Sequence, residues 1–312
     1  MKFSGNFSGI DHLQQRLYIH WDITTKCNYH CNYCYSWQDY EKNNQWNQET
    51  TKDKIFKILK SIELSSLPVF LGLLGGEPTI SKYYFDILNY IETKILPKHK
   101  DNRLYITTNL SKKIDWWKDH PKIKNTFIFA SFHPEYFNNI EDVLNFIIKL
   151  RYLSKYFKVK LNIMLDPKYI KILDLLYDFL PDIKDKVIIH PHIIYPNGSP
   201  FEDIQKIYKN DLKEFKKFFD YQKPEYIFND QKLTDFEVFQ NRFNQFQNWK
   251  CWQNNYEISL NGIVQNLCKN EITDNLISNP FFFKNIKKIV PLICPNKWCS
   301  CDGLLKCKKE KR

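Results

Sequence analysis

Three cysteines, Cys27, Cys31 and Cys34, lie within eight residues, directly after a short apolar run. Thiolates are the usual ligands of iron–sulfur clusters, and a four-iron cubane takes four ligands. Three cysteines at this spacing can therefore hold three irons and leave the fourth iron open to another ligand. The alternatives are a zinc site that a distant residue completes, or a set of buried free thiols.

A second motif, Gly75-Gly76-Glu77-Pro78, follows the next apolar run. The chain has only eight glycines, and three of them, counting Gly72, fall in this short segment. Because glycine lets backbone approach a ligand closely, backbone groups here can pair with the ammonium group of an amino acid, to which Glu77 adds negative charge. The alternative is an ordinary turn between a strand and a helix.

Together the two motifs resemble those of the radical S-adenosylmethionine (SAM) superfamily. The resemblance consists of a CX3CX2C loop with an aromatic residue, Tyr33, before the third cysteine, and a GGEP turn after the next strand, and it covers residues 15–195. It implies a [4Fe–4S] cluster whose open iron binds SAM. Reduction by a donor such as flavodoxin or ferredoxin then gives methionine and a 5′-deoxyadenosyl radical, which abstracts hydrogen from a substrate.

The same resemblance implies roles for individual residues. The turn at residues 75–78 would hold the methionine end of SAM, and the main chain near Tyr33 would face adenine. Ser131 would contact the ribose or the carboxylate, with Thr108 and Asn109 as further candidates. For these three polar residues, the alternative is a helix N-cap.

The other six cysteines all lie near the C-terminus. They are Cys251, Cys268, Cys294, Cys299, Cys301 and Cys307. Apolar residues alternate around Asn261-Gly262, which predicts a β-hairpin that brings Cys251 near Cys268. This region resembles the twitch and SPASM extensions that carry auxiliary iron–sulfur clusters.

The extension departs from that pattern in two ways. Its hairpin reads CX10GX5C, one residue longer after the glycine than usual, and the later cysteines read CX4CXC. We therefore expect one second iron–sulfur cluster, held by Cys251 and Cys268 with two of Cys294, Cys299 and Cys301. Cys307, in the lysine-rich tail, is not expected to be a ligand. The alternative is a structural zinc site of four cysteines.

Three histidines also fall near the ends of apolar runs. His190 and His192 are two residues apart in one predicted strand, so both face one side of the sheet. His133 follows another strand. Such histidines can bind substrate or relay protons, or they are simply buried, hydrogen-bonded residues.

The elements that would position these residues alternate along the chain. Strands are predicted at 17–23, 69–74, 103–108, 126–131, 158–165 and 187–193, and helices near 48–64, 81–96, 111–119, 139–157 and 168–178. This order favours parallel strands in an α/β fold, either a partial (β/α)6 TIM-like barrel or a doubly wound sheet. We expect the barrel in residues 1–200, a helical connector at 201–250 and a small cysteine-rich extension at 251–312.

Composition narrows the class of protein. No run of 18 or more apolar residues occurs, and the N-terminus lacks a signal peptide, so we expect a cytoplasmic protein without membrane association. Nine cysteines in that compartment favour metal binding over disulfides. The net charge of +11 comes from scattered lysines, which does not favour a nucleic-acid partner.

The predicted function is that of a radical SAM enzyme acting on a peptide or protein side chain, by oxidation, cross-linking or epimerisation. About sixteen residues precede the first strand, too few for a leader-recognition domain, which weakens the case for a peptide. The alternatives are a small polar metabolite or sugar as substrate, RNA modification, and a non-enzymatic iron–sulfur or zinc protein.

Overall fold

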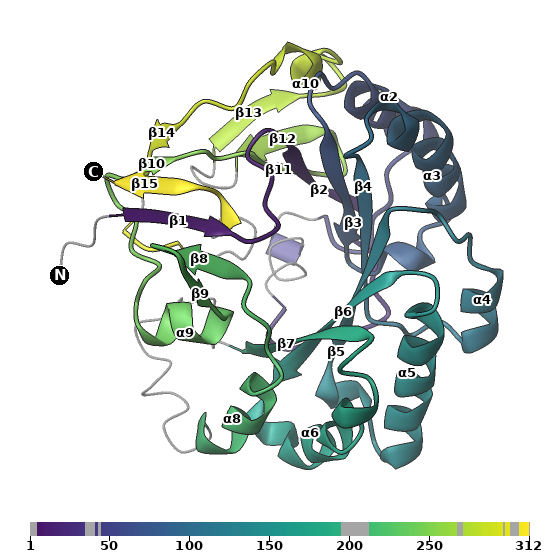
Figure 1. Ribbon diagram of the computed structural model, residues 1–312. Coiled ribbons are helices and arrows are strands. Elements are labelled where there is room, and N and C mark those ends of the chain that lie inside the picture. The colour runs from purple at the N-terminus through teal and green to yellow at the C-terminus, as the bar shows by residue number, and fades with distance from the viewer. Residues whose placement is uncertain are drawn as a thin grey trace.

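The computed structural model describes residues 5–34, 41–42, 45–194, 212–266, 271–295, 297–299 and 306–311 (Figure 1). Six adjacent parallel strands, ending at the edge strand β7, belong to a nine-stranded sheet whose order is β13-β12-β11-β2-β3-β4-β5-β6-β7. The six are β2 (Leu17–Thr24), β3 (Val69–Gly75), β4 (Arg103–Thr108), β5 (Thr126–Phe132), β6 (Lys158–Leu165) and β7 (Val187–Ile193). Each lies within one residue of its prediction, and the predicted partial barrel is confirmed.

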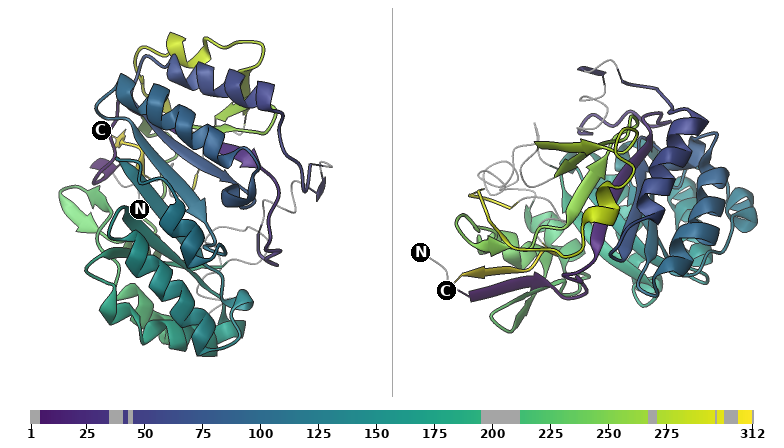
Figure 2. Two further views of the ribbon diagram at one scale, coloured as in Figure 1. Left: turned by 90° about the vertical axis from the view of Figure 1, so that its right-hand side faces the viewer. Right: turned by 90° about the horizontal axis from the view of Figure 1, so that it is seen from above.

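Helices cover the outer face of this sheet (Figure 2). They are α2 (Lys52–Glu63), α3 (Tyr84–Tyr90), α4 (Ile114–Asp119), α5 (Ile140–Leu153) and α6 (Ile170–Tyr177). The predicted helix at 81–96 ends as a π turn, η2 (Ile91–Ile95), and a 3-10 turn, η3 (Leu96–Lys98). Further 3-10 turns are η1 (Pro78–Ile80), η4 (Pro134–Tyr136), η5 (Pro167–Tyr169) and η6 (Leu180–Asp182).

Strand periodicity divides the side chains between two faces of the sheet. In β2, Leu17, Ile19 and Trp21 are buried in the main core with the helices. Residues between them, such as His20, point to the opposite side, which we call the inner face. Strand register places His20, Gly72 and Tyr105 in one row across β2, β3 and β4.

The C-terminal extension continues the barrel sheet. Strand β11 (Asn255–Ile258) pairs in parallel with β2, and β12 (Ile263–Asn266) and β13 (Glu271–Asn275) follow it antiparallel. The predicted hairpin is confirmed, and Gly262 at its turn has a φ of +76°, which favours glycine. A short helix, α10 (Phe282–Asn285), follows.

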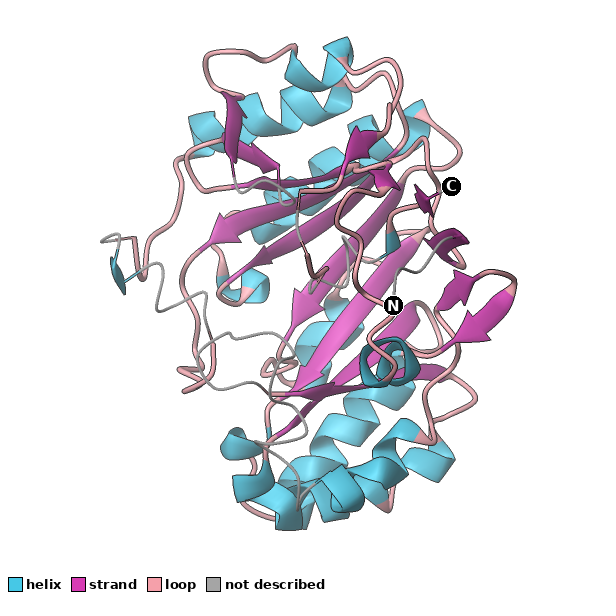
Figure 3. Cartoon of the chain, turned by 90° about the vertical axis from the view of Figure 1, so that its left-hand side faces the viewer, coloured by secondary structure: helices cyan, strands magenta, loops and turns pink. Residues whose placement is uncertain are grey.

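A second sheet joins the two ends of the chain (Figures 1 and 3). Its order is β14-β10-β15-β1-β8-β9. The bounds are β1 (Gly5–Gly9), β8 (Tyr226–Phe228), β9 (Gln231–Leu233), β10 (Lys250–Cys251), β14 (Leu292–Ile293) and β15 (Lys309–Lys311). Beneath it lies a separate small core that contains Phe7, Phe246 and Trp249.

The segment expected to be a helical connector differs from the prediction. It contains α8 (Leu212–Phe219) and α9 (Asp235–Gln240), but also the β8–β9 hairpin between them. Asn229 and Asp230 at the hairpin turn both have positive φ, at 46° and 68°, and this residue pair favours a tight turn. The strands themselves are only three residues long, too short for a clear pattern.

Glu225, just before β8, fastens the second sheet to the barrel wall. Its Oε1 lies 3.3 Å from Lys160 Nζ of β6 and 3.0 Å from His190 Nδ1 of β7, and Lys306 near the C-terminus pairs with Oε2. Although burial opposes the charge, Lys160, His190 and Lys306 hold the pKa of Glu225 well below its usual range. No helix in the described ranges has the length and apolarity that a membrane crossing needs.

Candidate metal centre and cofactor site

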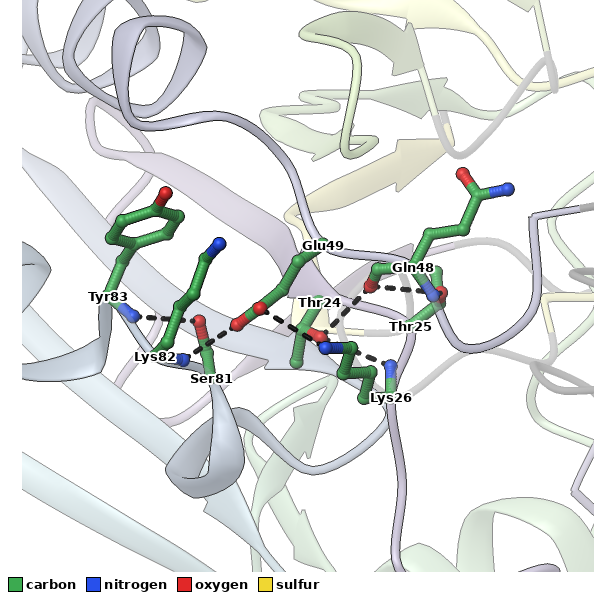
Figure 4. A network of polar contacts seen from close by, with 8 residues as sticks. All are labelled: Thr24, Thr25, Lys26, Gln48, Glu49, Ser81, Lys82 and Tyr83. Atoms are coloured by element: carbon green, nitrogen blue, oxygen red, sulfur yellow. Dashed lines mark hydrogen bonds and ion pairs between the residues drawn. The ribbon is translucent and has the colours of Figure 1, made fainter.

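The cysteine loop begins at the end of β2, where polar contacts fix its base (Figure 4). The hydroxyl of Thr24 donates to the carbonyl of Gln48, at 3.1 Å. Glu49 then bridges two segments, pairing with Lys26 Nζ at 3.3 Å and accepting from the backbone N–H of Lys82 at 2.7 Å. The loop therefore leaves the sheet from a defined position.

The glycine-rich turn after β3 packs directly against that base. The N–H of Gly76 donates to Thr24 O at 2.9 Å, and the N–H of Glu77 donates to Lys26 O at 2.7 Å. A Cβ on Gly75 would lie 1.9 Å from Thr24 O, and one on Gly76 would lie 2.1 Å from Lys26 O. Gly75 also has a φ of +114°. The glycines thus let the turn approach the base of the cysteine loop. From the sequence, we expected them only to let backbone approach a ligand.

Glu77 is buried, and its carboxylate accepts four hydrogen bonds. Oε1 accepts from the backbone N–H and the hydroxyl of Thr79, at 3.1 and 2.6 Å, and from the hydroxyl of Thr108 at 2.9 Å. Oε2 accepts from the N–H of Asn109 at 2.7 Å. Burial raises the pKa of Glu77, against the effect of these donors. The carboxylate fastens the turn to the end of β4, which differs from the expected role of offering charge to a ligand.

Thr108 and Asn109, predicted as SAM contacts, take part in this junction. The Thr108 hydroxyl is engaged with Glu77, and Asn109 reaches the cysteine loop, since its Nδ2 donates to Asn28 Oδ1 at 3.1 Å. Pro78, also predicted, is buried at the start of η1. The junction therefore brings the ends of β2, β3 and β4 together.

The three loop cysteines lie above this junction, with Cys31 buried and Cys27 and Cys34 half-buried. Burial raises the pKa of the Cys27 thiol to about 11 and raises that of Cys31 as well. Metal binding would therefore displace protons from these sulfurs. In the part of the chain that the structure describes, no three His, Cys, Asp or Glu side chains are already gathered around a metal position. The donor set, three thiols from one loop, fits a cluster with one open iron.

His133, from the end of β5, contacts the loop. Its Nδ1 lies 3.4 Å from Cys31 Sγ and 2.7 Å from the hydroxyl of Tyr33. Burial lowers the pKa of His133 to about 4, so the ring is neutral. Tyr136 stacks on Tyr29 with ring centroids 3.7 Å apart. His133 is predictable from its place after a strand, whereas Tyr136 is not, because η4 follows no periodic pattern.

The remaining predicted barrel residues lie along the inner face. Register aligns Ser131 of β5 with Asn162 of β6 and His190 of β7. His190 is buried and bound to Glu225, which supports the reading of a hydrogen-bonded structural residue. His192 lies next to it, with ring centroids 5.7 Å apart.

The C-terminal cysteines gather in the small core beneath the second sheet. Cys251, Cys294, Cys299 and Cys307 are all buried there. Cys268 and Cys301 lie outside the described residues, so the predicted approach of Cys251 to Cys268 stays a prediction. The open end of the hairpin is closed by Asn266 Nδ2, which donates to Gln253 Oε1 at 3.0 Å.

Cys307, which was placed in a lysine-rich tail and not expected to be a ligand, is buried beside Cys251 because β15 pairs with β10. Lys309 is its neighbour in β15 and is itself only 1% exposed. Burial opposes the charge on Lys309, but nearby Cys299, Cys251 and Cys307 hold its pKa above the usual value. A buried ammonium among thiols is suited to balance the negative charge of a thiolate metal site.

The chain is similar to several known proteins. Residues 21–180 match the family model described as the radical SAM superfamily. A GTP 3′,8-cyclase of Pasteurella multocida (strain Pm70) is 28% identical over 163 residues. That match spans 51% of this chain and 47% of the cyclase, about half the length of each protein.

Two solved structures share the fold. A structure of native anSMEcpe with bound AdoMet and the Cp18Cys peptide has a TM-score of 0.53 at 12% identity, covering 88% of this chain and 82% of that one. SuiB of Streptococcus suis has a TM-score of 0.50 at 17% identity, covering 88% and 66%.

The hydrogen bonds of Glu77 predict how its replacement changes the stability of the fold. Replacing the carboxylate in Glu77→Gln leaves one buried backbone N–H facing an amide NH2, so we expect the free energy of unfolding to fall by about 1–3 kcal/mol. Urea unfolding measures this, with the exposed Glu92→Gln as the matched control. Equal stability of the two variants would show that the carboxylate does not fasten the turn.

Proposed function

Because the chain belongs to the radical SAM superfamily, we propose that it cleaves SAM reductively and uses the resulting radical to modify a peptide or protein side chain. The observation that carries the first part is the junction at Glu77. It holds the three-cysteine loop, the glycine turn and the end of β4 in one place, at the carboxyl ends of parallel strands where ligands of such folds bind.

Each part of this site has its own task. Cys27, Cys31 and Cys34 would hold a [4Fe–4S] cluster, and backbone groups of Gly75 and Gly76 would bind the methionine end of SAM. The bound cluster would supply the electron for reductive cleavage of SAM to methionine and a 5′-deoxyadenosyl radical. Tyr33 and Ser131 would contact adenine and the ribose.

His133 orients the loop in this account. Its ring is neutral and lies against Cys31 and Tyr33, so it fixes the sulfur without adding charge. The contact with His133 thus covers the buried Cys31 and holds its position, as outer-shell groups of metal sites do.

The C-terminal thiols support the proposal that the enzyme oxidises its substrate. The chain has two sets of cysteines, the three-cysteine loop and the buried set beneath the second sheet. Hydrogen abstraction by the radical would remove one electron from the substrate, and a second iron–sulfur cluster would accept the other. The ligands of this cluster would come from the C-terminal cysteines, of which Cys251, Cys294 and Cys299 are buried in the small core. The fold shared with a protein that holds AdoMet and a peptide is consistent with a peptide substrate.

A small polar molecule is the second candidate substrate. The similarity to a GTP 3′,8-cyclase favours it. Consumption of GTP with formation of one 5′-deoxyadenosine per GTP would select this candidate over a peptide.

The first functional prediction concerns SAM itself. Protein that is reconstituted anaerobically and reduced should convert SAM to 5′-deoxyadenosine, measured by liquid chromatography. Changing Cys27, Cys31 and Cys34 to Ala should abolish this activity, whereas Phe85→Ala on the outer surface of α3 should retain it. Turnover in the triple variant would refute the assignment.

The second prediction separates iron from zinc in the extension. Two cubanes require about eight irons per chain, and removing the first three cysteines should leave about four. Anaerobic metal analysis gives both numbers. About four irons with one zinc in the wild-type protein would show that the extension is a structural zinc site.

A further inference from the structure

A row of hydrogen bonds crosses the inner face of the barrel and ends at the sulfur of Cys307. The hydroxyl of Tyr105 lies 2.5 Å from His20 Nδ1, and His20 Nε2 lies 3.2 Å from Asn255 Oδ1. Asn255 Nδ2 in turn lies 3.1 Å from Cys307 Sγ. The four residues come from β4, β2, β11 and the segment before β15, so the row spans the barrel and the extension.

Gly72 makes this row possible. Tyr105 and His20 lie two strands apart, and Gly72 of β3 lies between them in the same register. A Cβ on Gly72 would lie 2.0 Å from the Tyr105 ring. Phe129 stacks on the other side of that ring, with centroids 4.7 Å apart. The ring is therefore clamped so that its hydroxyl crosses β3.

The direction of the hydrogen bonds is fixed at Asn254. Its Nδ2 faces three backbone carbonyls, the closest being Arg16 O at 2.7 Å, so its Oδ1 must face inward. Asn255 Nδ2 lies 3.2 Å from that Oδ1, which identifies it as the amide nitrogen. The same nitrogen also faces Cys307 Sγ, which accepts from it at 3.1 Å. The Cys307 thiol in turn donates to Asn254 Oδ1 at 3.4 Å, a bond that ends when the thiol loses its proton.

The rest of the row follows from this assignment. Asn255 Oδ1 faces His20, so His20 Nε2 carries the hydrogen. Burial lowers the pKa of His20, which keeps the ring neutral, and its Nδ1 therefore accepts from the hydroxyl of Tyr105. Every bond donates toward the extension, and aligned hydrogen bonds of this kind polarise one another.

The sulfur at the end of the row lies among polar and positively charged groups. Cys251, His12 and the Lys309 ammonium are all close to it. Lys309 is held in place by its bond to Cys307 O at 2.9 Å and by the Phe246 ring, 4.9 Å away. An electron-rich sulfur among donors is the state that a metal-bound thiolate needs.

We propose that Tyr105, His20 and Asn255 are positioning residues of a metal centre that includes Cys307. Through their aligned hydrogen bonds, a change in polarity at the inner face alters the electron density on the Cys307 sulfur. The inference extends the proposed second metal site but does not depend on which metal fills it. It assigns a ligand role to a cysteine that the sequence pattern sets aside. It also gives the barrel a direct connection to the extension.

Cobalt(II) titration of the full-length chain tests this, in a background where Cys27, Cys31 and Cys34 are Ala. Thiolate-to-cobalt charge-transfer absorption then reports on the C-terminal site alone. The variants are Cys307→Ala, Asn255→Leu and Tyr105→Phe. Tyr84→Phe is the matched control, because Tyr84 and His120 form a buried pair at 2.8 Å outside the row.

We expect Cys307→Ala to lower the thiolate-to-cobalt charge-transfer absorption by the contribution of one thiolate ligand. Asn255→Leu should weaken cobalt binding about tenfold or more and move the band to longer wavelength. Tyr105→Phe should move the band in the same direction by less, and Tyr84→Phe should match the parent. If Asn255→Leu does not fold, Asn255→Asp takes its place: it keeps the acceptor for His20 and replaces the amide that donates to Cys307 Sγ and Asn254 Oδ1 by a carboxylate.

The proposal is overturned if Cys307→Ala leaves the absorption unchanged, or if the parent shows none. It is also overturned if Asn255→Leu and Tyr105→Phe both behave like Tyr84→Phe. Zinc in place of iron in the purified protein would refute the second iron–sulfur cluster, yet it would leave the cobalt result to decide this row separately.

Discussion

The buried carboxylate of Glu77 is the constraint around which the candidate site is organised. A carboxylate removed from water costs much free energy unless donors replace the lost solvation. Here the donors come from Thr79, Thr108 and Asn109, in two different segments, so the charge is tolerated only while these segments stay together. The glycines at 75 and 76 complete the arrangement, because only a residue without a Cβ fits against the carbonyls of the cysteine loop.

The extension depends on a comparable balance of buried charge. Lys309 lies in an aromatic and thiol environment where an ammonium group alone would be unfavourable. Deprotonated sulfurs around Lys309 would balance the positive charge of its ammonium group, and metal binding would keep them deprotonated. Because β15 pairs with both β1 and β10, placing these sulfurs also fixes both ends of the chain. The extension is therefore built into the barrel rather than appended to it.

The sequence predicts the repeating part of the fold well, since strands buried under helices leave strong apolar runs bounded by turns. It also predicts the hairpin at Asn261-Gly262, because that turn demands particular residues. It does not predict the second sheet, whose strands of two to five residues come from distant parts of the chain. The burial of Cys307 was missed for the same reason: the lysines around it suggest a solvated tail, and only strand pairing shows that Lys309 is enclosed.

Within the site, local motifs identify the participants but not their partners. Spacing finds the three cysteines and the glycine turn, whereas the contact of Asn109 with Asn28 requires the folded barrel. The direction in which Glu77 points likewise depends on donors contributed by β4.

The central claim is that the three-cysteine loop leaves one iron open and that SAM binds there. Electron paramagnetic resonance of the reduced protein, recorded with and without saturating SAM, tests this most directly. The account predicts that SAM changes the g values of one cluster signal, and that this signal is missing when Cys27, Cys31 and Cys34 are replaced. A wild-type spectrum that is the same with and without SAM would contradict it.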